Sequence, residues 1–251
     1  MLNLSSMKNI RYIIAVFIVY VAQFALAGVQ ALSDNEVKDE ILYYIAPRCG
    51  VRGKRTQLVD TYFINGNTNR LLRLLSDLIK TNDEWICTRS MWQYGKYATK
   101  SELPFLYSCA TNSMCGDRAL NTIISLDGIS SNLLQTVGQY FSITNGFSVD
   151  DDANRSRFAE NLLKRVYRTE ALLPYRERVF NMTREFALNV NLMHVSVDKA
   201  LMRVDPTYEN SKRRLNVMRG ARERCISDFL TNYVTNIINK LEMYPEENLP
   251  D

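Results

Sequence analysis

The side chains best suited to catalysis are scarce in this chain. His194 is its only histidine, so a zinc site with two histidines is excluded and general-base catalysis at neutral pH loses its commonest residue. His194 adjoins Met193 and Val195 in a helical pattern, which favours a structural role. The sequence holds no G-x-S-x-G turn, no glycine-rich phosphate loop and no dinucleotide-binding motif. We therefore expect no cofactor and no enzyme activity.

A short acidic run partly matches a calcium-binding loop. Asp150, Asp152 and Asn154 occupy the first three ligand positions. However, Arg155 stands where the tight turn needs glycine, and Asn161 stands where a bidentate glutamate is needed. Acidic residues at the start of a helix interact favourably with its dipole, which explains the run without an ion. The sequence therefore predicts no metal site.

The first 27 residues have the pattern of a cleavable secretory signal. Lys8 and Arg11 precede an apolar run over residues 12–27, which ends on small residues at Ala25 and Ala27. This run is shorter than the roughly 20 apolar residues that a membrane-spanning helix needs. We expect cleavage after Ala27 and a secreted, extracellular mature chain without membrane insertion. The alternative is an uncleaved anchor.

Export would place the cysteines in an oxidising compartment, where disulfides are the default. We therefore expect most of the cysteines to be paired. Sequence alone leaves the connectivity open, although Cys109 and Cys115 are close enough in the chain to close a small loop. The odd number leaves one thiol over, or available for a disulfide to another chain. The candidates are Cys49, Cys87, Cys109, Cys115 and Cys225.

Two further modifications depend on the same export. Asn154 and Asn181 each begin an acceptor tripeptide for N-linked sugar, so we predict a glycoprotein. Arg52, Lys54 and Arg55 form a basic tetrapeptide with Gly53, of the kind that secretory-pathway convertases cleave. A loop between helices is a suitable place for such a cut.

Apolar residues recur at helical spacing along most of the chain, whereas glycine and proline are sparse. Ser33 and Glu36 form a capping box at the start of a helix that Pro47 ends. A wide apolar stripe over residues 71–79 predicts a second strong helix. Asp83 is placed to cap the helix that follows.

That following helix carries Trp85 and Trp92 among its apolar residues. In the second half of the chain, helical spacing runs through residues 153–167. It continues over residues 175–204, as one long helix or two broken near residue 196, and over residues 215–241 as a last long helix. Short connections make such neighbours antiparallel.

These patterns predict an all-α fold, a disulfide-stapled helical bundle. Shorter helices occupy residues 28–149, and about three long antiparallel helices occupy residues 150–251. A single continuous domain over residues 28–245 is the alternative. The turn and acidic run at residues 144–152 mark the expected boundary.

Charge and composition narrow the function further. Cleavage after Ala27 removes two of the 31 basic residues and leaves 29 against 27 acidic ones, a balance that argues against nucleic-acid binding. We expect a secreted, non-catalytic helical protein that binds a protein partner, as a ligand, a hormone-like precursor or an effector. One alternative is an extracellular carrier of a small apolar ligand, with a pocket of aromatic and methionine side chains. Another is a carboxylate-dependent hydrolase.

Overall fold

The computed structural model of the chain describes residues 33–45, 68–143, 149–189, 195–223 and 228–250. Every regular element within these ranges is helical, which confirms the all-α prediction. The chain divides into two compact units, Met1–Ala98 and Thr99–Asp251. The predicted boundary at residues 149/150 therefore falls within the second unit, and helices on both sides of it belong to that unit.

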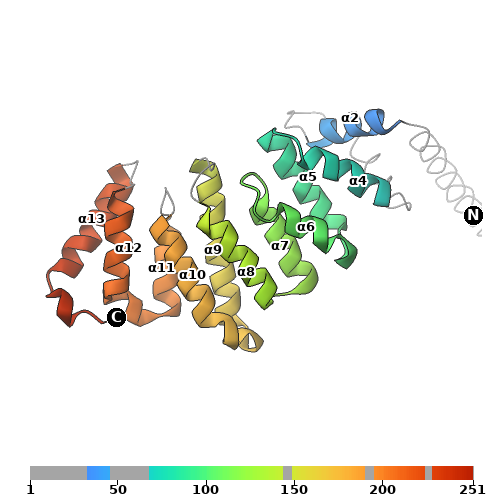
Figure 1. Cartoon of the computed structure of the whole chain (residues 1–251). Helices are drawn as coiled ribbons and strands as arrows, with labels where there is room; N and C mark the ends of the chain where they lie inside the picture. The colour runs from blue at the N-terminus through green and yellow to red at the C-terminus, as the bar shows by residue number, and fades with distance from the viewer. Residues whose placement is uncertain (1–32, 46–67, 144–148, 190–194, 224–227, 251) are drawn as a thin grey trace, which may run out of the picture. The chain divides into compact units, whose positions relative to one another are not determined.

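The first unit is built on a hairpin of α4 (Thr68–Ile79) and α5 (Glu84–Tyr97), drawn in Figure 1. Asp83 caps α5 as predicted, because its carboxylate accepts a hydrogen bond of 2.9 Å from the Ile86 N–H. Burying one leucine contributes about 1.5–3 kcal/mol, so apolar packing stabilises this hairpin. The buried face of α4 consists of the predicted stripe: Leu71, Leu72, Leu74, Leu75, Leu78 and Ile79.

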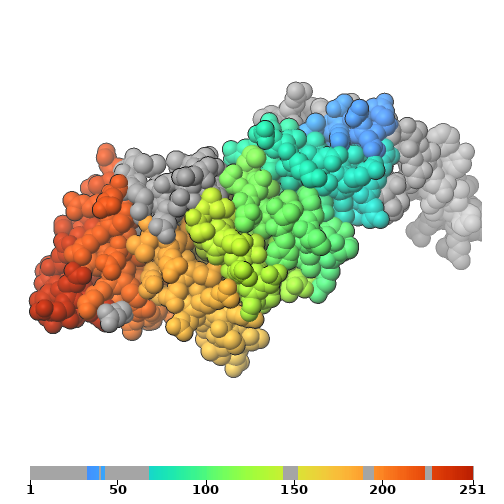
Figure 2. Space-filling model, viewed as in Figure 1, coloured from blue at the N-terminus to red at the C-terminus, as the bar shows by residue number. Residues whose placement is uncertain are grey.

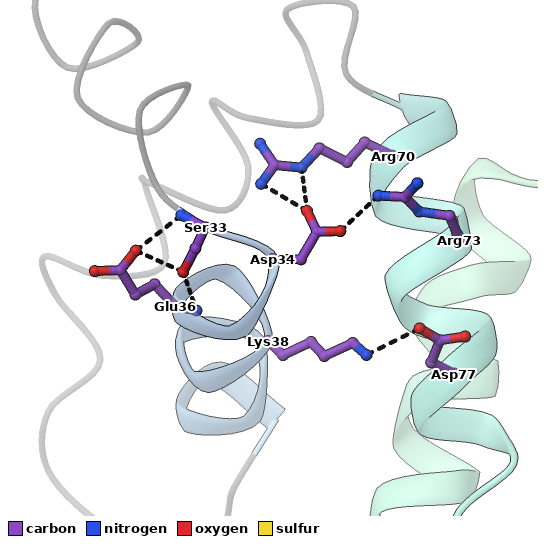
Figure 3. Close-up of polar contacts among 7 residues, drawn as sticks. All are labelled: Ser33, Asp34, Glu36, Lys38, Arg70, Arg73 and Asp77. Atoms are coloured by element: carbon purple, nitrogen blue, oxygen red, sulfur yellow. Dashed lines mark hydrogen bonds and ion pairs between the residues drawn. The ribbon is translucent and has the colours of Figure 1, made fainter.

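Helix α2 (Asp34–Ile45) begins with the predicted capping box. The Ser33 hydroxyl accepts from the Glu36 N–H at 3.3 Å, and the Glu36 carboxylate accepts from the Ser33 N–H at 2.8 Å (Figure 3). The Ser33 hydroxyl also donates to the Glu36 carboxylate at 2.7 Å, and this bond, together with the one from the Ser33 N–H, lowers the pKa of Glu36. Val37 and Ile41 are buried, so α2 packs through the apolar face that its sequence predicts.

Ion pairs also join α2 to α4. Asp34 lies between Arg70 and Arg73, at 2.7 Å and 2.6 Å, and Lys38 contacts Asp77 at 2.9 Å (Figure 3). The hydrogen bond from Arg70, with the charge of Arg73, lowers the pKa of Asp34. Such partly exposed pairs contribute little net stability. Their regular spacing along both helices fixes how α2 lies against α4.

The second unit stacks its helices in two rows. In one row α9 contacts both α7 and α11, and in the other row α10 contacts both α8 and α12. Figure 1 shows α9 to α13 side by side in chain order. Side chains close the spaces between α6, α7 and α8 on the face seen in Figure 2. The helices are α6 (Leu103–Cys109), α7 (Gly116–Asp127), α8 (Ser131–Ser142), α9 (Val149–Arg168), α10 (Arg176–Asn189), α11 (Val195–Val204), α12 (Lys212–Arg222) and α13 (Asp228–Glu242).

Of the three long helices predicted for the second half, the first is present as the single helix α9, and each of the other two regions holds two helices among the described residues. Residues 175–204 contain α10 and α11, which agrees with the predicted alternative of two helices. Residues 215–241 contain most of α12 and all of α13 except Glu242. Helices α12 and α13 pack against each other, so the chain reverses between them. In the sequence, the apolar residues before and after residues 223–227 keep nearly the same helical repeat. Periodicity alone therefore predicts one helix over this region.

Gly116, the first residue of α7, lies where no side chain fits. A Cβ there would stand 2.7 Å from both the Ala110 carbonyl oxygen and Cε2 of Tyr140. We expect Gly116→Ala to lower the free energy of unfolding by about 1–3 kcal/mol, measured by urea denaturation. Gly138→Ala is the matched control, because its Cβ would meet only Met182 Cε at 3.7 Å. The better helix propensity of alanine should stabilise that variant by up to about 1 kcal/mol. Equal effects at the two positions would contradict this packing.

Candidate functional site

One face of α5 carries an exposed row of aromatic and basic side chains. We call Trp85, Arg89, Trp92 and Lys96 the α5 stripe. Their spacing of four, three and four residues places them on one line along the helix, over about 16 Å. Trp85 is 39% exposed and Trp92 is 45% exposed. The chain contains no other tryptophan.

The opposite face of α5 orients this stripe. Cys87, Met91 and Tyr94 are buried, as are the polar Ser90 and Gln93. The hairpin partner α4 presents a continuous leucine surface to the interior of the unit. Because the buried side of α5 is anchored there, its outer side must face away from the core.

Each tryptophan of the stripe lies beneath a cation one helical turn further on. The Arg89 guanidinium carbon is 4.3 Å from the centroid of Trp85, and the Lys96 ammonium is 3.7 Å from that of Trp92. Such contacts stabilise by about 0.5–1 kcal/mol at exposed sites. The only carboxylate of α5 is Glu84, at its first position. The arrangement therefore suits binding to a negatively charged, partly apolar surface.

Two buried polar clusters lie in the second unit, and the first is centred on Arg155. Its guanidinium contacts the Asp152 carboxylate at 3.0 Å. Its Nη2 also donates to three backbone oxygens near the carboxyl end of α8, those of Tyr140 (2.9 Å), Phe141 (3.1 Å) and Ile143 (2.8 Å). Asp152 is therefore committed to an arginine that caps α8, rather than placed to bind an ion.

The second cluster joins α11, α12 and α13. The Arg214 guanidinium binds both oxygens of Asp198, at 3.1 Å and 2.8 Å, and donates to the Glu209 carbonyl at 2.9 Å. The Tyr233 hydroxyl donates to Asp198 at 2.8 Å. Burial, together with the charge of Asp198, raises the pKa of Tyr233. Asp198 accepts three hydrogen bonds, so this cluster is suited to holding helices together.

Comparison with protein-family models, with curated proteins and with solved structures finds no match to this chain. Within the described ranges, no group of three His, Cys, Asp or Glu side chains could hold a metal ion. A search of the same ranges finds no helix with the length and apolar character needed to cross a membrane.

The predicted disulfide stapling is not supported by the structure. Cys87, Cys109 and Cys115 are all buried, and no two sulfur atoms of the described cysteines lie at bonding distance. Cys109 ends α6, and Cys115 precedes the first residue of α7. Buried cysteine packs as a small apolar residue, so short separation in the chain does not imply a bond. Cys49 and Cys225 lie outside the described residues.

The two predicted glycosylation sites lie in helices, Asn154 in α9 and Asn181 in α10, and both asparagines are partly exposed. The hydroxyl residues of their tripeptides, Ser156 and Thr183, have no exposed surface. Attachment of sugar would therefore have to precede the folding of these helices. Glycosylation remains a prediction.

The remaining sequence predictions lie outside the described residues. They are the signal over residues 1–27, the basic site at Arg52, Lys54 and Arg55, and the lone His194.

The apolar residues of α5 do not by themselves show on which side of it the tryptophans lie. The structure places them opposite the buried face of α5. A signal for this was present in the sequence, because seven residues separate the tryptophans and a basic residue follows each by four. This spacing favours a row of stacked pairs on one side of a helix.

Proposed function

We propose that this protein is a secreted, non-catalytic helical protein that binds a partner protein through the α5 stripe. The observation that carries the proposal is the placement of both tryptophans of the chain on one exposed helix face, each stacked against a cation. Tryptophan and arginine are the residues most enriched among the energetic hot spots of protein interfaces.

The exposure of these two indoles supports the proposal further. Tryptophan offers a large apolar area and loses little conformational freedom on binding, because it has only two side-chain torsions. The neighbouring helix α4 buries its apolar residues almost completely, so the unit has a well-packed interior into which the tryptophans do not enter. The α5 stripe thus combines interface-forming residues with a rigid support.

Export is part of the same proposal. An exported chain would lose residues 1–27, carry N-linked sugar at Asn154 or Asn181, and form a disulfide through Cys49 or Cys225. Intact mass of the secreted protein, with and without reduction and deglycosylation, tests these three features together. A full-length product with all five thiols reduced would contradict them.

Truncation of Trp92 tests the binding function. A partner is first captured from extracellular fluid on the immobilised protein, then purified, and its Kd is measured by calorimetry. We expect Trp92→Ala to weaken binding at least about tenfold, as truncation of a hot spot does. The matched control is Phe229→Ala on α13, which removes a side chain that is 72% exposed. Its Kd should stay within about twofold of the wild-type value. A partner that binds the Trp92→Ala variant equally well would contradict the role of the stripe.

A further inference from the structure

We infer that the α5 stripe recognises an acidic segment of the partner, whose carboxylates pair with Arg89 and Lys96 while its aliphatic side chains pack on the indoles. This inference rests on the proposed function and names the chemistry of the partner. The first support is charge. From Trp85 to Tyr97 the helix carries Arg89 and Lys96 and no carboxylate, so the stripe has a single sign of charge over most of its length.

The spacing of the cations is the second support. Arg89 and Lys96 are seven residues apart, which separates them by about 10 Å along the helix axis. Carboxylates three residues apart on a polyproline-II segment lie on one side and have nearly the same separation, at three residues per turn and about 3.1 Å per residue. Carboxylates seven residues apart on a helix match it equally. An acidic segment of either kind can therefore reach both cations at once.

The stacked geometry is the third support. Each cation is already held against an indole, at 4.3 Å for Arg89 and 3.7 Å for Lys96. Side chains that are ordered before binding lose less conformational entropy when a partner arrives. Arginine adds a planar, two-pronged hydrogen-bonding group that matches a carboxylate.

The surroundings of the stripe favour a narrow segment over a broad anionic surface. Asp83 and Glu84 are exposed at the end of the stripe next to Trp85. An anionic bilayer laid on α5 would cover these carboxylates as well as the cations, and like charges would then repel. A peptide segment can follow the stripe from Arg89 to Lys96 and leave that end uncovered.

Titration with poly-L-glutamate tests the inference directly. Both tryptophans of the chain belong to the stripe, so intrinsic tryptophan emission of the full-length protein reports this face alone. We expect a saturable change in emission at low ionic strength that weakens as salt is added. The double variant R89E/K96E should raise the half-saturating concentration at least about tenfold, since reversal turns attraction into repulsion.

The matched control is K199E/R203E, which reverses two exposed cations four residues apart on α11. Its half-saturating concentration should stay within about twofold of the wild type. Circular dichroism and urea denaturation verify folding of each variant, and R89Q/K96Q replaces the reversal variant if that one fails to fold. An absent emission change, or equal binding by R89E/K96E, would overturn the inference.

Two other anionic probes separate the alternatives. Stronger binding to heparin than to poly-L-glutamate would overturn the inference in favour of a sulfated glycan. Stronger binding to vesicles of phosphatidylcholine with phosphatidylserine would overturn it in favour of a membrane surface. If a purified partner depends on Trp92 yet binds R89E/K96E normally, the acidic segment is wrong while the proposed function stands. If no partner depends on Trp92, the proposed function itself fails.

Discussion

Replacement of Arg155 by methionine should lower the free energy of unfolding by about 3–5 kcal/mol, the cost of breaking a buried ion pair from one side. The variant leaves the Asp152 carboxylate, which is 1% exposed, without its cation. It also removes the donor that serves three backbone oxygens at the end of α8. Buried acceptors that lose their donor cannot recover it from water, so both losses act in the same direction.

Urea denaturation followed by far-ultraviolet circular dichroism measures this loss. Tryptophan emission is unsuitable, because both tryptophans lie in the first unit and Arg155 lies in the second. Arg157→Met is the control, because Arg157 is exposed on the same helix. The hydrogen bond described for its side chain is a long one, 3.4 Å to Asn154. It should change stability by less than about 0.5 kcal/mol. A loss at Arg155 no larger than this would show that the capping contacts carry little energy.

Removal of the Asp198 side chain should have a comparable effect. Asp198→Ala leaves the Arg214 guanidinium buried and unneutralised, and it also removes the acceptor of the Tyr233 hydroxyl. We expect a loss of about 3–5 kcal/mol in the same denaturation measurement. The Asp198 carboxylate on α11 accepts hydrogen bonds from Arg214 on α12 and Tyr233 on α13. We therefore expect the packing of these three helices to weaken together.

Two further variants test whether the stability lost in Asp198→Ala comes from breaking the ion pair or from leaving one buried charge without a partner. Glu242→Ala breaks an exposed pair with Arg219, in which both side chains are nearly half exposed, and should cost less than about 1 kcal/mol. The double variant Asp198→Leu with Arg214→Met removes both buried charges, and it should recover part of the loss seen with Asp198→Ala. If the double variant is less stable than the single one, the pair itself is the source of stability.

Local spacing predicts the features of this fold that depend on one helix. The Ser33 capping box, the Asp83 cap and the leucine face of α4 follow from residues within a few positions of one another, and the structure confirms all three. The all-α class follows from the same periodicity.

Features that depend on contacts between helices are the ones that sequence reasoning misses. Helix α12 ends at Arg222 and α13 begins at Asp228, although the apolar spacing in the sequence continues from one to the other. The role of Arg155 depends on carbonyl groups of residues 140, 141 and 143, whose position relative to α9 no local pattern encodes. The exposure of Trp92 also depends on which side of α5 packs against α4, and in the sequence only the basic residues four positions after each tryptophan indicate that side.

The two-row stack of the second unit has a kinetic consequence. Each described helix from α7 to α12 contacts mainly the next helix and the next but one, so most native contacts join segments close together in the chain. Closing short loops costs little entropy, and proteins with such low contact order fold quickly. Assembly can begin at any adjacent pair of helices and spread to its neighbours.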